Sequence, residues 1–111
     1  MTETLLPASN AQTVSLSSVP RLSIPEFRRT LLDSIERGAR ISALFACPEK
    51  DRFRLLAVLA DPSCERLSVT STETDGEYPS LTPDCPQAHW FEREIAEQWG
   101  IVPLGHPWLK P

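Results

Sequence analysis

Apolar residues recur with helical spacing between Ser23 and Gly38. Ser23 followed three residues later by Glu26 fits a capping box, and Pro25 is tolerated in a first helical turn. Gly38 can adopt the left-handed conformation that ends a helix. The pattern predicts a helix over about residues 24–37. Its apolar side consists of Ile24, Phe27, Leu31 and Ile35.

Three later runs alternate in the manner of strands: residues 40–46, 52–60 and 65–72. In the first run, Ile41, Ala43 and Phe45 are predicted to share a face. The second run is apolar on both faces, which is typical of a central, buried strand. The polar link at 47–51 is short, so the first two runs are predicted to form an antiparallel hairpin. The third run is weaker and depends on Leu67 and Val69.

A second helix is predicted over about residues 86–99, with Pro86 in its first turn and Gly100 at its end. Ile101 is placed to fold back on the last turn. One side of this helix carries Ala88, Phe91, Ile95 and Trp99. The order of elements predicts an α+β domain: a small antiparallel sheet of three or more strands with two flanking helices.

Two segments lack regular patterning. Residues 1–20 are rich in Ser and Thr and have little apolar surface, which predicts a flexible tail ahead of a domain at 21–111. Residues 73–86 contain Gly76 and three prolines, so they cannot form one regular element. This stretch is long for a loop, and we expect it to be packed down or functional.

Composition and charge narrow the class of protein. The 111 residues allow one small domain, and the net charge is −4 without a basic cluster, which argues against nucleic-acid binding. No apolar run approaches the roughly 20 residues that cross a membrane. The N-terminus does not resemble a signal peptide, so we expect a cytoplasmic location without membrane insertion. The three cysteines form no C-x-x-C pair, and we expect reduced thiols and no metal or cluster site in this chain.

Polar residues near the C-terminus are the candidates for chemistry. His89, Glu92 and Arg93 can cluster on one helix, where a histidine and a carboxylate can bind metal or exchange protons. A catalytic zinc needs three protein ligands, and the other histidine, His106, is predicted in a turn. There is no nucleophile motif or phosphate-binding glycine loop. The sequence therefore argues against an independent enzyme and predicts no catalytic or cofactor-binding residues.

Two tryptophans are candidates for an interaction surface. Trp90 lies outside the apolar stripe of the second helix, beside Glu94, and Trp108 follows in a proline-bounded segment. Aromatic residues next to arginine and carboxylates are typical of protein–protein interfaces. The alternative is that Trp90 packs under the long loop. The residues alone leave these two interpretations equal.

The stretch from Tyr78 to Pro111 resembles the signature of the respiratory-chain 30-kDa subunit family, whose bacterial members are the C subunits of NADH:quinone oxidoreductase. The version here is most similar to the equivalent domain of membrane-bound group 4 nickel–iron (NiFe) hydrogenases, including formate hydrogenlyase. The matching residues are Glu92, Arg93, Glu94, Glu97, Gly100, Ile101, Gly105, His106, Pro107 and Leu109. Glu97 replaces the usual aspartate, and Lys110 with Pro111 replaces a common pair of arginines.

The resemblance implies a structural subunit without its own cofactor. Such subunits pack against a large catalytic subunit and a small iron–sulfur subunit, on the cytoplasmic face of the inner membrane. A NiFe centre or iron–sulfur clusters are then expected in the partners, because this chain lacks the paired C-x-x-C thiolates that a NiFe centre needs. The competing interpretation is a stand-alone regulatory or binding module that reuses the fold.

The resemblance also leads to a hypothesis about what holds the predicted helix at 86–99 in place. Arg93 is expected to fix it to the turn at 105–107 by charge-assisted hydrogen bonds. Trp90, Trp108 and Lys110 are then left for a partner. The chain ends directly after this turn, which favours a fragment of a fusion or a small assembly subunit.

Overall fold

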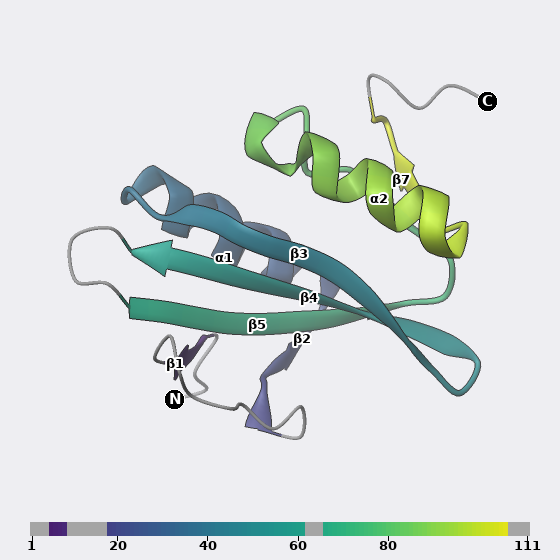
Figure 1. The fold of residues 1–111 in the computed structure, drawn as a ribbon, viewed down its shortest axis with the longest axis horizontal. Helices are drawn as coiled ribbons and strands as arrows, with labels where there is room; N and C mark the ends of the chain where they lie inside the picture. The colour runs from purple at the N-terminus through teal and green to yellow at the C-terminus, as the bar shows by residue number, and fades with distance from the viewer. Residues whose placement is uncertain (1–4, 9–17, 62–65, 107–111) are drawn as a thin grey trace.

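The computed structural model describes residues 5–8, 18–61 and 66–106, which form an α+β domain (Figure 1). Its main sheet has the strand order β1-β5-β4-β3, with β2 also paired to β5, and a separate pair joins β6 to β7. The elements are β1 (Leu6–Ala8), β2 (Arg21–Leu22), α1 (Ile24–Glu36), β3 (Arg40–Glu49), β4 (Arg52–Asp61), β5 (Arg66–Thr74), β6 (Glu77–Pro79), a 3₁₀ turn (Pro86–Ala88), α2 (His89–Trp99) and β7 (Val102–Leu104).

One hydrophobic core joins both helices to one face of the main sheet. Phe27 and Leu31 of α1 and Ile95 of α2 are buried against Leu55 and Ala57 of β4. The strands β1, β5, β4 and β3 pair antiparallel, whereas β2 adds to β5 in parallel. The predicted fold class, an antiparallel sheet with two flanking helices, is therefore confirmed.

Helix α1 begins and ends where the sequence predicts. The Ser23 side chain accepts a hydrogen bond from the Glu26 backbone N–H. At the other end, Gly38 has φ +104° and donates to the Ile35 carbonyl, while Ala39 donates to the Ser34 carbonyl. These two bonds form a Schellman motif, which satisfies carbonyls that the helix itself leaves unpaired.

Strand β3 corrects one prediction. Its pairing with β4 shifts register between Ile41 and Ala43, which is the mark of a β-bulge. Because a bulge adds one residue, the side chains after it change face. Leu44 and Ala46 are therefore buried, whereas Phe45 is 41% exposed and lies opposite Leu56. The prediction that Phe45 shares the face of Ile41 was wrong.

Strand β4 is buried on both faces, as predicted. Phe53, Leu55, Ala57 and Leu59 contribute to the core under the helices. Leu56 and Val58 belong to a second cluster with Val19 and Val69 on the opposite face. The hairpin is tighter than predicted, because β3 extends through Cys47, Pro48 and Glu49 and leaves only Lys50 and Asp51 in the turn.

Within the predicted tail, the residues that the structure describes lie against the sheet, and three of them form a strand. Leu6 to Ala8 form β1 against β5, and Val19 is buried in the second cluster. The rest of the predicted tail, residues 1–4 and 9–17, lies outside the described residues. Leu6 and Val19 are the apolar residues that make this docking favourable.

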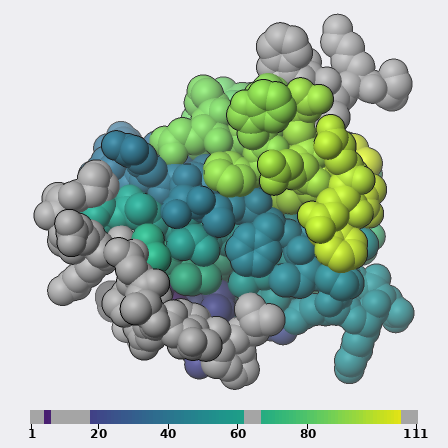
Figure 2. All heavy atoms as spheres, viewed as in Figure 1, coloured from purple at the N-terminus to yellow at the C-terminus, as the bar shows by residue number. Residues whose placement is uncertain are grey.

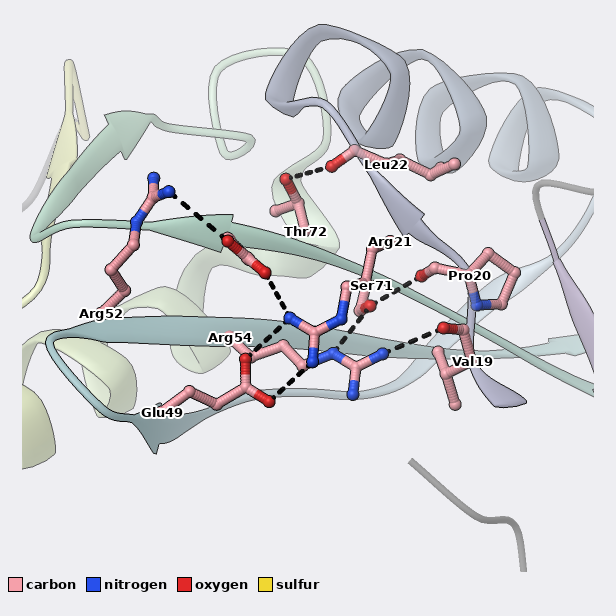
Figure 3. Close-up of polar contacts among 10 residues, drawn as sticks. Val19, Pro20, Arg21, Leu22, Glu49, Arg52, Arg54, Ser71 and Thr72 are labelled. Carbon is pink, nitrogen blue, oxygen red and sulfur yellow. Dashed lines mark hydrogen bonds and ion pairs between the residues drawn. The ribbon is translucent and has the colours of Figure 1, made fainter. Parts of the chain in front are cut away.

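A buried arginine holds the segment before α1 against the sheet (Figure 3). Arg54 of β4 is 1% exposed and donates hydrogen bonds to the Ser71 hydroxyl and the Val19 carbonyl, both at 3.0 Å. Ser71 donates to the Pro20 carbonyl, and Thr72 donates to the Leu22 carbonyl. Hydrogen bonds therefore connect β4 and β5 to residues 19–22.

Charged side chains cover the same end of the sheet. Arg21 forms two hydrogen bonds with Glu49, at 2.8 and 2.9 Å, and also pairs with Glu73, which in turn approaches Arg52 (Figure 3). Arg21 lowers the pKa of the Glu49 carboxyl, chiefly through these hydrogen bonds. Burial, followed by the positive charge of Arg21, lowers the pKa of Arg54.

The two cysteines that the structure describes are free. Cys47 is half-buried and Cys85 is buried. Burial raises the pKa of the Cys85 thiol, which favours the neutral form. Cys64 lies outside the described residues, and the reduced state of the three thiols stays a prediction.

Candidate functional site on helix α2

Helix α2 has a buried side and an outward side, as its sequence pattern predicts. Ala88 and Ile95 are buried, and Phe91 and Trp99 pack against the same core. Trp90 faces away from this stripe and is 65% exposed, more than any other large hydrophobic residue in the described ranges. Figure 2 shows α2, in green to yellow-green, on the surface of this face of the molecule.

Glu92 is the most enclosed residue of the signature triplet, with a side chain that is 0% exposed. Its carboxylate accepts five hydrogen bonds, all from the segment between Tyr78 and Thr82. The donors are the hydroxyls of Tyr78 (2.6 Å), Ser80 (2.7 Å) and Thr82 (2.5 Å), and the backbone N–H groups of Leu81 (3.0 Å) and Thr82 (3.1 Å).

This carboxylate fixes the long loop to α2. A buried charge is tolerated only when hydrogen bonds replace its hydration, and five donors do so here. Burial, followed by the negative charge of Glu92, raises the pKa of the Tyr78 hydroxyl. Arg28 of α1 adds a second hold, since it donates to the Ser80 carbonyl at 2.8 Å and pairs with Asp84. Of the two alternatives that the sequence left open for residues 73–86, packed down or functional, these contacts show the first for the part between Tyr78 and Asp84.

The same segment contains a strand that the sequence did not predict. Glu77–Pro79 form β6, which pairs in parallel with Val102–Leu104 of β7. The Val102 N–H donates to the Gly76 carbonyl, and the Ser80 N–H donates to the Leu104 carbonyl. A pairing between segments about 25 residues apart follows from the way α2 reverses the chain, and no local pattern reports it.

The burial of Glu92 was missed, although the sequence contains a signal for it. Glu92 lies four residues after Ala88 and three before Ile95, which places it within the apolar stripe. A carboxylate in that position has to find buried donors. The hydroxyl-rich segment from Tyr78 to Thr82 supplies them.

The role predicted for Arg93 is not found. Its guanidinium pairs with Glu97 at 3.7 Å and lies over the Trp90 ring, 5.1 Å from the ring centroid. Within the described ranges it makes no hydrogen bond to Gly105 or His106, and its buried Nε has no partner. Pro107 lies outside the described residues. The helix is instead held by Glu92, because that side chain points inward.

Aromatic rings connect the C-terminal turn to the helix. The His106 ring stacks on the His89 ring, with centroids 5.1 Å apart and planes at 21°. The His106 Nε2 lies 3.4 Å from the His89 carbonyl oxygen. The His89 ring in turn lies 5.4 Å from the Trp90 ring. His89, the candidate zinc ligand, is therefore part of this stack.

The remaining signature residues that the structure describes differ in their surroundings. Gly100 ends α2 with φ +72° and Gly105 has φ +83°, both in the left-handed region. Ile101 is completely buried. Glu94 and Glu97 are exposed. Four predicted site residues lie outside the described ranges: Pro107, Trp108, Leu109 and Lys110.

The part of the chain that the structure describes contains neither a candidate metal site nor a candidate membrane-spanning helix. No group of three or more His, Cys, Asp or Glu residues within 5–8, 18–61 and 66–106 could hold a metal ion. In the same ranges, no helix has the length and apolar character needed to cross a membrane.

Known proteins match most of this chain. The model of the family described as "Respiratory-chain NADH dehydrogenase, 30 Kd subunit" matches residues 17–111. The C subunit of NADH-quinone oxidoreductase from Caulobacter vibrioides is 38% identical over 81 residues, which are 73% of this chain and 36% of that protein. Formate hydrogenlyase subunit 5 of Escherichia coli is 52% identical over 79 residues, which are 65% of this chain and 14% of that protein.

A third relative shows how short the shared region can be. The C/D subunit of NADH-quinone oxidoreductase from Methylococcus capsulatus is 44% identical over 45 residues, 40% of this chain and 8% of that protein. The chain thus spans between about a twelfth and about a third of the length of these relatives.

Proposed function

This chain belongs to the respiratory-chain NADH dehydrogenase 30 kDa subunit family, and on that premise we propose that it is a non-catalytic structural subunit or domain of an oxidoreductase complex. The complex is of the complex I type or the membrane-bound hydrogenase type. Relatives named as subunits of NADH-quinone oxidoreductase and of formate hydrogenlyase support this. In this proposal, the chain binds the large catalytic subunit and the small iron–sulfur subunit and holds them together.

The exposed Trp90 carries this proposal. Tryptophan and arginine dominate the binding energy of protein interfaces, because large planar groups exclude water over a wide area. Trp90 is 65% exposed and lies beside Arg93 on the outward side of α2. Exposure of such a ring is unfavourable in an isolated domain, and burial against a partner would remove it from water.

Cofactors and membrane attachment belong to the partners in this proposal. A NiFe centre or iron–sulfur clusters would be held by the large and small subunits, and this chain would bind neither. The chain would lie at the cytoplasmic face of the inner membrane, peripheral and attached through the complex. Trp108 and Lys110 would extend the interface that Trp90 begins.

The test is affinity capture of the tagged chain from native membranes, with the partners identified by mass spectrometry. We expect the wild-type chain to recover a large catalytic subunit together with a small iron–sulfur subunit. Recovery of neither, from cells that express such a complex, would contradict the proposal and favour a stand-alone regulatory or binding module.

Two variants locate the interface. Trp90→Ala removes an exposed ring and is expected to reduce recovery at unchanged stability. Phe45→Ala removes another exposed ring, on β3, and serves as the matched control. Equal loss of recovery in both variants would show that α2 is not the docking element.

A further inference from the structure

We propose that Arg93 is a positioning residue that holds Trp90 ready for docking, and that the partner surface at Trp90 is an apolar slot bordered by a lysine or arginine opposite Glu94. This inference rests on the proposed docking function and names the chemistry of the partner. Two observations carry it: the Trp90 ring, which neighbouring side chains hold on α2, and the carboxylate beside it, which is unpaired among the described residues.

The Trp90 ring is held from two sides. The Arg93 guanidinium lies 5.1 Å from its centroid, and Glu97 holds that guanidinium from the next turn at 3.7 Å. The His89 ring lies 5.4 Å away and is itself stacked on His106. A side chain that is already confined loses little rotamer entropy on binding, so the confinement raises affinity.

The charge beside Trp90 indicates what the partner carries. Glu94 lies one turn beyond Trp90 on the outward side, and its carboxylate has no ion pair or hydrogen bond with the described part of the chain. Arg93, the cation of this face, is already occupied by Glu97 and by the Trp90 ring. Among the residues that the structure describes, the face therefore presents a carboxylate whose charge is unmatched. A lysine or arginine at the rim of the partner slot would match it.

Two other exposed patches lack these properties. Val102 and Leu104 of β7 are 48% and 47% exposed. However, Pro103 between them has no N–H, and its carbonyl accepts a bond from His106, so an added strand would find few backbone partners there. The hollow at the β3–β4 turn is lined by Arg21, Glu49, Arg52 and Glu73, whose charges already pair with one another.

The positioning role is tested on the full chain by ¹⁵N relaxation of the Trp90 indole N–H. In the wild type we expect an order parameter near that of the rigid backbone, about 0.85, and in Arg93→Ala a fall below about 0.6. Glu94→Gln is the control and should leave it unchanged. An equally rigid indole in Arg93→Ala would overturn the positioning role.

The chemistry of the partner is tested with the subunits recovered by affinity capture. Binding kinetics are measured at low and at physiological ionic strength. Glu94→Lys is expected to slow association about tenfold at low ionic strength, with a smaller effect at the higher one. Trp90→Ala is expected to speed dissociation by more than about tenfold. Glu36→Lys on α1 makes the same charge change on another helix and should have little effect.

The outcomes separate this inference from the proposed function. If the wild-type chain captures its partners but Glu94→Lys associates as fast as wild type, the basic rim is wrong and docking stands. If Trp90→Ala dissociates at the wild-type rate, the anchor is elsewhere. If the wild-type chain captures neither of the two expected partners, the proposed function itself is contradicted.

Discussion

At the scale of single residues, Glu92 is the strongest polar determinant of this fold. Its carboxylate joins α2 to a segment ten to fourteen residues earlier in the chain through five donors. A surface carboxylate such as Glu94 makes no such contacts with the described residues. The two glutamates of the Glu92-Arg93-Glu94 triplet therefore differ in their contacts. Glu92 supports the fold, and Glu94 is available to a partner.

Because the two glutamates differ in their contacts, we expect their replacement to change the free energy of unfolding by different amounts. Glu92→Gln replaces a carboxylate oxygen by an amide group that faces donors, and we expect it to lower the free energy of unfolding by about 3 kcal/mol. Glu94→Gln is the matched change on the exposed side and should alter it by less than about 0.5 kcal/mol. Urea denaturation measures both. Similar losses in the two variants would contradict the assigned role of Glu92.

The buried hydroxyl of Tyr78 makes the stability of the fold depend on pH in the alkaline range. The folded protein raises the pKa of this hydroxyl through burial and the charge of Glu92, whereas an unfolded tyrosine titrates near about 10. The neutral form is therefore favoured in the folded state. The stability that this group contributes is complete below about pH 10 and is lost as the pH rises above it.

The measurement is direct because Tyr78 is the chain's one tyrosine. In an alkaline titration, we expect the ultraviolet absorbance of tyrosinate to rise together with the loss of circular dichroism, and not before it. Tyr78→Phe should show a shallower decline of stability above about pH 10. Ionisation of Tyr78 near its ordinary pKa in a protein that is still folded would refute the burial of its hydroxyl.

At the scale of elements, the ends of helices and strands follow local chemistry. Ser23 and Gly38 define α1, and Gly100 ends α2 in the left-handed conformation. The β3–β4 turn is less well matched to its sequence. Lys50 has φ +50°, the one positive value among non-glycine residues of the described ranges. That conformation is unfavourable for a residue with a β-carbon, and asparagine tolerates it best among such residues.

Lys50→Asn is therefore expected to stabilise the protein, by about 0.5–1 kcal/mol, because the turn keeps its conformation at lower cost. Asp51→Asn, in the same turn at a negative φ, is the control and should change stability little. Thermal and urea denaturation measure both variants. A loss of stability in Lys50→Asn would mean that the lysine makes a contribution beyond its backbone conformation.

At the scale of the whole molecule, the two faces of the sheet are covered differently. The helices bury one face through a continuous apolar core. On the other face, a small apolar cluster is supplemented by Arg54, which binds the chain before α1 to β4 and β5. Arg54 thus links parts of the chain about 35 residues apart.

Arg54→Ala is expected to lower the free energy of unfolding by about 3 kcal/mol, because the variant leaves a cavity and an unpaired Val19 carbonyl. It should also speed proteolysis before Leu22. Arg52→Ala removes an exposed arginine of the same strand and should cost less than about 1 kcal/mol. Denaturation and mapping of the cleavage sites measure the pair. Unchanged cleavage before Leu22 in Arg54→Ala would contradict the linking role.

The amino-acid sequence by itself determined the two helices, the three long strands and the family. Periodicity located both helices and the three long strands, since side-chain burial repeats with the backbone geometry. The stretch from Tyr78 to Pro111 indicated the family, which the comparison of residues 17–111 shows. Spacing along the helix also placed Trp90 outside the apolar stripe, but whether the long loop covers it was left open, and its 65% exposure in the structure decides that it is not covered.

Only the tertiary structure decided which polar residues are buried and which segments meet. The bulge in β3 reversed Phe45, the β6–β7 pair joined distant segments, and Glu92 and Arg54 found partners 10 to 35 residues away. A local pattern reports whether a position faces inward. It does not report which donor lies opposite, because that depends on how the packed elements bring separate parts of the chain together.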